Sequence, residues 1–191
     1  MKQGDKTKQL ILSTANQLFY QQGFAKTSLN DIVKLTGLSK GNITYHFKSK
    51  KDILFGVVKM RNTDIKNRLD SWNNEISVVP DRLERFCDIL MVEQENLIKY
   101  GCPMGTLIGE LSKNEPELYE MSLQMLDTFR HWLKQQFKQL GFSNNKAEEN
   151  SLELLSRAQG ISAIAHLTKD AEFLKSATTK FKSYIHVIAQ S

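Results

Sequence analysis

The sequence predicts an all-helical protein of about nine helices, with three short helices at the N-terminus and a larger helical domain behind them. Apolar residues recur every three or four positions along nearly the whole chain, which is the helical period. Glycine and proline fall between these stretches, and no strand-like alternation competes with them. We therefore expect a three-helix N-terminal domain at residues 1–50 and a helical C-terminal domain at residues 51–191.

Glycines and capping residues divide the N-terminal third. The first apolar stripe ends at Gly23, as expected for a left-handed helix stop. Ser28 with Asp31 has the spacing of a capping box and begins a short second helix that ends at Gly37. Ser39 can cap a third helix. The three expected helices are about Ile11 to Gly23, Ser28 to Thr36 and Ser39 to Phe47.

The later helices are longer. Ser49 with Asp52 repeats the capping pattern and opens a fourth helix that continues to Trp72, after which Asn73 to Pro80 loses the helical period and is expected to be a loop. The remaining helices are expected at about Leu83 to Ile98, Gly105 to Lys113, Leu118 to Leu140, Asn145 to Leu167 and Ala171 to Ala189.

Charge is unevenly distributed. Residues 1–60 contain ten lysines and three aspartates, a net charge of +7, whereas the rest of the chain carries −2. A basic segment on a nearly neutral body is typical of proteins that contact phosphates, although solvated lysine faces also occur without any partner. No apolar stretch is long enough for a membrane span, and no signal peptide is visible, so a cytoplasmic protein without a membrane partner is expected.

The segment from Thr27 to Phe47 has the pattern of two short helices joined by a tight glycine turn. Its apolar residues can close a small core with the first helix; they are Leu29, Ile32, Val33, Leu38, Ile43 and Phe47. Its third helix would direct polar residues outward, namely Lys40, Asn42, Thr44, Tyr45 and His46. This arrangement is typical of helix-turn-helix DNA-binding proteins.

Over about residues 8–55 this segment resembles the TetR/AcrR family of transcriptional regulators, through its Thr-Ser start, its Gly-Leu-Ser turn and its aromatic end. The resemblance implies that base edges are read in the major groove by Lys40, Gly41, Asn42 and Thr44. Thr44 departs from the family pattern, in which tyrosine is common. The resemblance also implies phosphate contacts from Thr27, Ser28, Tyr45, His46 and Lys50, and the Ser39 cap is compatible with a DNA contact as well. Tyr45 and His46 could instead pack against the fourth helix, and the serines also act as caps.

The resemblance implies two roles for the C-terminal domain. Family members pair their last two helices between subunits, which places at a dimer interface Leu155, Ala158, Ser162, Ala165, Phe181, Tyr184, Ile185 and Ile188. The family also binds small molecules in this domain, with candidate contacts at Phe86, Met91, Cys102, Met104, Met125, Phe129, Trp132 and His166. The interface residues could instead close the core of the monomer. For each ligand candidate, ordinary core is the more common role of such a residue, because aromatic and methionine stripes at helical spacing are usually core.

The function expected on this basis is a homodimeric repressor that a small-molecule ligand releases from a pseudopalindromic double-stranded operator. The alternative is a helical small-molecule-binding protein or a thiol-based redox sensor acting through Cys102. Cys102 lies at an expected helix start, where the helix dipole increases thiol reactivity, whereas Cys87 lies on an apolar stripe. No enzyme motif is present, and neither a cofactor nor a metal ion is expected.

Overall fold

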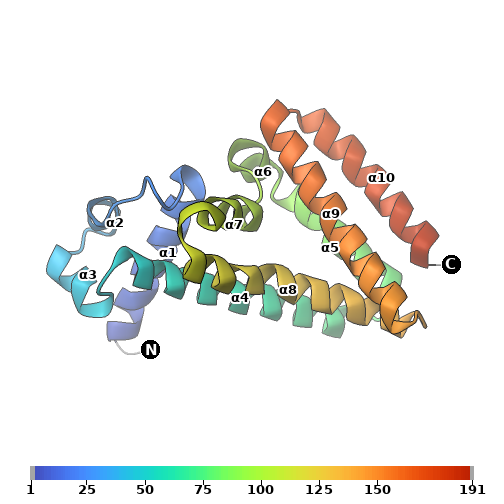
Figure 1. Cartoon of the computed structure of the whole chain (residues 1–191), viewed down its shortest axis with the longest axis horizontal. Helices are drawn as coiled ribbons and strands as arrows, with labels where there is room; N and C mark the ends of the chain where they lie inside the picture. The colour runs from blue at the N-terminus through green and yellow to red at the C-terminus, as the bar shows by residue number, and fades with distance from the viewer. Residues whose placement is uncertain (1–2, 190–191) are drawn as a thin grey trace. The chain divides into compact units, whose positions relative to one another are not determined.

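The computed structural model describes residues 3–189, without the side chain of Asn114, and every regular element in that range is an α-helix (Figure 1). None of the described helices is long and apolar enough to cross a membrane. The helices are α1 (Gln3–Gln22), α2 (Leu29–Thr36), α3 (Lys40–His46), α4 (Lys50–Glu75), α5 (Val79–Val92), α6 (Gln94–Tyr100), α7 (Pro103–Asn114), α8 (Pro116–Gln139), α9 (Asn144–Thr168) and α10 (Ala171–Ala189).

The all-helical fold class is confirmed, with one helix more than the nine expected in the described range. The stretch expected as a single helix from Leu83 to Ile98 is divided at Glu93 into α5 and α6. Its apolar stripe continues through the break, since Leu90 and Leu97 are both buried. A break of one residue leaves such a stripe intact, so periodicity alone does not reveal it.

The chain divides into two compact units. The first consists of Met1–Asp64 and Thr106–Met125, and the second of Ile65–Gly105 and Leu126–Ser191. The boundary expected at residue 50 was drawn between two expected functions and differs from the division into packing units, so it stays a prediction. The new observation is that residues 106–125 pack with the N-terminal helices.

The core of the first unit is built around α1. Ile32, Ile43 and Phe47 are buried, as expected, while Leu29, Val33 and Leu38 of the same predicted core are only half-buried. Helices α1 and α4 pack closely at Gly56, where an added Cβ would lie 2.6 Å from a methyl carbon of Leu12. In the parts of α1 and α4 that belong to this unit, the buried apolar residues are Ile11, Leu12, Ala15, Leu18, Phe19, Ile53, Leu54, Val57 and Val58.

The buried core of the second unit is formed mainly by α5, α8, α9 and α10, with α9 and α10 side by side (Figure 1). At its centre the ring of Phe86 lies 5.7 Å from that of Phe129 and 6.5 Å from that of Phe181, measured between centroids. Cys87 is buried beside them, and burial raises the pKa of its thiol. These aromatic contacts join helices that are distant in the sequence.

The connection between α4 and α5 is shorter than the loop expected at Asn73 to Pro80, because α4 continues to Glu75 and α5 begins at Val79. Proline is accepted in the first turn of a helix, where the missing N–H has no helical partner, so Pro80 lies within α5. Arg82 stabilises the end of α4, since its guanidinium donates hydrogen bonds to the carbonyl groups of Asn73, Ile76 and Ser77.

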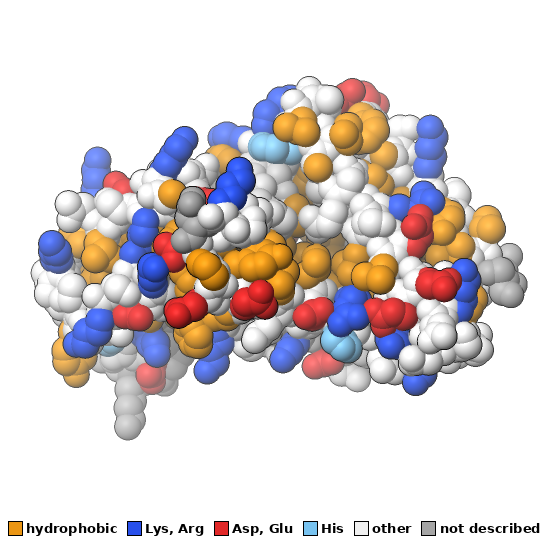
Figure 2. Space-filling model, in the orientation of Figure 1, with side chains coloured by type: hydrophobic (Ala, Val, Ile, Leu, Met, Phe, Trp, Pro, Cys, Tyr) orange, Lys and Arg blue, Asp and Glu red, His pale blue; other side chains and the backbone are white. Residues whose placement is uncertain are grey.

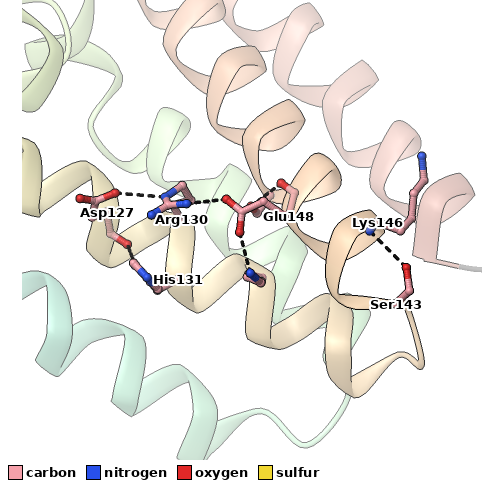
Figure 3. A network of polar contacts seen from close by, with 8 residues as sticks. Asp127, Arg130, His131, Ser143, Lys146 and Glu148 are labelled. Atoms are coloured by element: carbon pink, nitrogen blue, oxygen red, sulfur yellow. Dashed lines mark hydrogen bonds and ion pairs between the residues drawn. The ribbon is translucent and has the colours of Figure 1, made fainter.

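A charged network joins α8 to α9 at their connected ends (Figure 3). The carboxylate of Glu148 accepts hydrogen bonds from Arg130 and from Lys134, the latter at 2.8 Å. Arg130 also binds Asp127 at 3.0 Å. The two cations hold the pKa of Glu148 below its ordinary value, with the Lys134 hydrogen bond as the main cause. This network fixes α9 against α8 within the second unit.

Candidate nucleic-acid interface

The start of α2 is fixed by a complete capping box. The Ser28 hydroxyl accepts the Asp31 backbone N–H at 3.2 Å, and the Ser28 backbone N–H donates to the Asp31 carboxylate at 2.8 Å. The backbone hydrogen bond from Ser28 is the main cause of a lowered Asp31 pKa. The predicted cap is therefore confirmed, and the N-terminal turn of α2 is held in a defined position at the surface.

The turn between α2 and α3 depends on the backbone freedom of Gly37. Its φ is 68° and ψ is 7°, in the left-handed region, and its N–H donates to the Val33 carbonyl at 3.0 Å. An added Cβ would meet nothing within 4 Å, so the requirement for glycine comes from the backbone angle and not from space. Ser39 then caps α3, accepting the Asn42 N–H at 3.1 Å. These contacts set the direction in which α3 leaves α2.

Helix α3 has one buried face and one exposed face. Ile43 is fully buried, and Phe47 directly after the helix is 6% exposed. Tyr45 is 78% exposed, and Lys40, Gly41 and Asn42 are exposed as well. Thr44 and His46 are half-buried. The separation of faces that the sequence predicted is present, and it leaves the exposed face available to a partner.

Two predicted contact residues, Thr44 and Thr27, donate side-chain hydrogen bonds to backbone carbonyls within the fold. The Thr44 hydroxyl donates to the carbonyls of Lys40 and Gly41, both at 3.1 Å. Thr27, expected at a phosphate, is only 1% exposed, and its hydroxyl donates to the Gly23 carbonyl at 2.7 Å. The Thr27 side chain thus closes the turn that follows α1, and little of it is left to contact a phosphate.

Lys50 was also expected at a phosphate, but it bonds to its own domain. Its ammonium donates to the carbonyls of Phe24 at 2.7 Å and Ala25 at 3.3 Å and lies 4.3 Å from the centre of the Phe24 ring. Desolvation lowers the pKa of Lys50. Lys51 is likewise paired, at 2.6 Å with Glu115. Lysines that remain exposed around α2 and α3 are Lys26, Lys34, Lys40 and Lys48.

The sequence pattern did not indicate that Glu110 contacts the loop before α2. Its carboxylate accepts the backbone N–H groups of Phe24 and Ala25 at 2.9 and 2.7 Å. It lies more than eighty positions away in the chain, outside the helix-turn-helix pattern, so no local spacing pointed to it. Figure 2 shows basic side chains around the end of the molecule that carries α2 and α3, with a few carboxylates among them.

The residues expected to bind a ligand lie in both compact units. Met125 belongs to the first unit and is fully buried, whereas the other seven belong to the second. Phe86 and Phe129 contact each other in the core, and the buried Trp132 donates its indole N–H to Asn73 at 3.0 Å. Met91, Cys102, Met104 and His166 are half-buried. The Cys102 sulfur accepts a hydrogen bond from Gln159 at 3.4 Å. Their role toward a ligand stays a prediction.

Most residues expected at the dimer interface pack inside their own chain. Leu155, Ala158, Ser162, Ala165, Phe181 and Ile185 are at most 8% exposed, while Tyr184 and Ile188 are half-buried. The buried six have almost no surface to offer a second subunit. The exposed face of α9 carries a different stripe, in which each residue lies three or four positions from another member: Leu152, Ser156, Gly160, Ala163, Ile164 and Leu167.

Residues 11–57 match the family described as "Bacterial regulatory proteins, tetR family". The chain is 26% identical over 180 residues to an uncharacterized HTH-type transcriptional regulator of Lactococcus lactis, covering 89% of this chain and 88% of the relative. It is 32% identical over 103 residues to the HTH-type transcriptional regulator QacR of Staphylococcus aureus, covering 54% and 52%.

Among solved structures, a TetR transcriptional regulator from Legionella pneumophila has the same fold, with a TM-score of 0.83. The match covers 93% of this chain and 96% of that one, at 22% identity. The likeness therefore extends through the C-terminal helices, beyond the segment that matches the family.

Proposed function

Because the chain belongs to the TetR/AcrR family of transcriptional regulators, we propose that it is a ligand-responsive repressor that binds operator DNA as a homodimer. The observation that carries the proposal is the division of α3 into a buried face with Ile43 and an exposed face with Lys40, Asn42 and Tyr45. A helix whose apolar face packs on the domain core can enter the major groove with its exposed polar face. The proposal gives the chain a binding function in the cytoplasm, with no reaction to catalyse.

Within the groove, two exposed side chains have suitable chemistry for base recognition. The Asn42 amide can bond adenine in a bidentate manner, and the Lys40 ammonium can donate to guanine. Tyr45, Ser28 and Lys48 can contact phosphates beside them and fix the register of the helix. Thr27 and Lys50 are omitted from the proposed interface because Thr27 is only 1% exposed and the Lys50 ammonium is bonded to two backbone carbonyls.

A single α3 reads only a few base pairs, so useful specificity requires two copies on a pseudopalindrome. We place the subunit interface on the exposed stripe of α9. Apolar Leu152, Ile164 and Leu167 are 50%, 46% and 75% exposed. Ser156, Gly160 and Ala163 lie between them and are small enough for another helix to approach closely. This surface replaces the buried residues that the sequence indicated.

Ligand binding in the second unit would favour a dimer whose recognition helices no longer match adjacent grooves. Helix α4 is the proposed lever, because it is one continuous helix whose residues belong to both units. The coupling is a free energy, and it is measured as the loss of operator affinity when a ligand is present.

Selection of bound duplexes from a random pool tests the proposal. We expect enrichment of an inverted repeat and binding of one dimer to it. Asn42→Ala should cost about 1–3 kcal/mol and relax the preference at one base pair of each half-site. Lys48→Ala is the matched control, and it should weaken binding to every sequence alike while reducing the salt dependence by about one ion. Monomeric protein that enriches no sequence would overturn the proposal.

A further inference from the structure

We propose that Glu110 of α7 is a positioning residue for DNA recognition, holding the loop between α1 and α2 in the conformation from which α2 starts. The inference rests on the proposed function, because it assigns a role in the binding of DNA to a residue outside the helix-turn-helix. Glu110 lies in the first compact unit together with that loop.

The contact is bidentate and charge-assisted. One carboxylate oxygen, Oε2, accepts the Phe24 N–H at 2.9 Å, and the other, Oε1, accepts the Ala25 N–H at 2.7 Å. Two successive backbone donors directed at one carboxylate define the orientation of both peptide groups. Hydrogen bonds to an ionised acceptor are roughly twice as strong as neutral ones. The loop is therefore bound to α7 by its backbone, whatever side chains it carries.

Lys50 of α4 completes the arrangement from the carbonyl side. Its ammonium donates to the carbonyls of the same two residues, Phe24 and Ala25, at 2.7 and 3.3 Å. Desolvation lowers the Lys50 pKa, while the negative charge of Glu110 opposes that shift. The Glu110 carboxylate thus binds the N–H groups of Phe24 and Ala25, and the Lys50 ammonium binds their C=O groups. The four residues line a pocket of about 410 Å³.

The held segment leads directly into the start of α2. Gly23 reverses the chain with a φ of 89°, and the Thr27 N–H then donates to the Phe24 carbonyl at 3.3 Å. The next residue, Ser28, is the cap of α2. A shift of Phe24 therefore moves the first turn of α2 and, through the Gly37 turn, the direction of α3. Glu110 acts on DNA through this chain of contacts, without touching it.

The sign of the effect on affinity separates this role from simple electrostatics. Removal of a carboxylate from a DNA-binding domain reduces repulsion of phosphates and should strengthen binding. Loss of a positioning contact should instead weaken binding, because only part of the population then holds the competent conformation. The two explanations predict opposite changes for Glu110→Gln, which removes the charge and nearly preserves the shape.

The experiment compares the full-length wild type with Glu110→Gln, Glu110→Ala and the control Glu120→Gln. Glu120 is an exposed carboxylate of α8 in the same unit. The probe is the inverted repeat selected by the wild type, measured at a temperature where circular dichroism shows each variant fully folded. We expect Glu110→Ala to bind about tenfold more weakly, or about 1.4 kcal/mol, and Glu110→Gln about threefold more weakly. Glu120→Gln should bind as the wild type or slightly more tightly.

Hydrogen exchange gives a second readout that does not depend on DNA. The amides of Phe24 and Ala25 should exchange faster in Glu110→Ala, while those of the α3 core around Ile43 keep their protection. The inference is overturned if both Glu110 variants bind as tightly as Glu120→Gln, or if the two loop amides keep wild-type protection. A wild type that selects no duplex would overturn the proposed function instead, and the exchange experiment would still test the contact itself.

Discussion

The geometry of the helix-turn-helix and that of the C-terminal helices are determined by different kinds of contact. In the first, neighbours in the sequence fix the geometry: Ser28 caps with Asp31, Ser39 caps with Asn42, and Gly37 makes the turn. In the second, residues far apart do so, as in the ring contacts of Phe86 with Phe129 and Phe181. Caps and glycine turns therefore specify the local geometry of the chain. An amphipathic stripe specifies that a side chain is buried, but not which residues it contacts.

The largest effect should come from Phe181→Ala. Its side chain is 2% exposed in the core of the second unit, and truncation of a buried phenylalanine costs about 3–5 kcal/mol. Urea unfolding monitored by circular dichroism measures the loss. Val187→Ser on the same helix is the control, since Val187 is 68% exposed and its change should stay within about 0.5 kcal/mol. Equal losses from the two variants would contradict the assignment of Phe181 to the core.

Arg82→Ala should remove about 2–4 kcal/mol, because the guanidinium binds three carbonyls at the end of α4 and the side-chain oxygens of Gln136 and Gln139. Thermal unfolding measures the effect. Arg85→Ala is the control on the same helix: Arg85 is half exposed and has an ion pair of 3.8 Å with Asp88, so a change below about 1 kcal/mol is expected. An unchanged melting temperature for Arg82→Ala would contradict the stabilising role of these hydrogen bonds.

Ile164→Glu should weaken the proposed dimer by about 2 kcal/mol, because it replaces an apolar residue of the exposed stripe of α9 by a charge. Sedimentation equilibrium measures the dissociation constant. Val92→Glu adds the same charge at another apolar residue, 70% exposed on α5, and should leave the association unchanged. If Val92→Glu dissociates the dimer and Ile164→Glu does not, the interface lies elsewhere than on α9.

Gly37→Ala and Gly109→Ala test the local side of the comparison. A Cβ at either position meets nothing within 4 Å, so only the backbone angle differs between them. Gly37 has a φ of 68°, and alanine there should cost about 1–2 kcal/mol. Gly109 is inside α7, where alanine should stabilise by about 0.5–1 kcal/mol. Denaturant titration of both variants should therefore give changes of opposite sign, and equal signs would contradict the role of the turn.

The smallest effect concerns the Glu148 network. Since the folded chain lowers the pKa of Glu148, its contribution to stability is present at neutral pH and is lost as the pH falls through that lowered value. Glu148→Gln should melt below the wild type at pH 7, with a difference that shrinks below about pH 4. Glu149→Gln, at a side chain that is 67% exposed, is the control. A difference that does not change with pH would show that charge is not the cause.

The fold class, the capping box, the Gly37 turn and the two faces of α3 could be predicted from the sequence. Each depends on residues within a few positions of one another, so it can be recognised from the local sequence without knowledge of the tertiary structure. The break at Glu93 could not be predicted in the same way, because the apolar stripe crosses it unchanged. Thr27 and Lys50 were expected at phosphates because of the family resemblance, and the structure shows both bonded to the turn after α1, through contacts that the motif does not reveal.

The sequence by itself thus determined that the chain is helical and that its N-terminal part presents a polar helix, because spacing and caps are local properties. Only the tertiary structure decided which side of α9 is buried, which lysines stay exposed, and that Glu110 binds the loop before α2. Those outcomes depend on contacts between residues tens of positions apart, and the free energy of such a contact is defined only once the chain has brought both partners together.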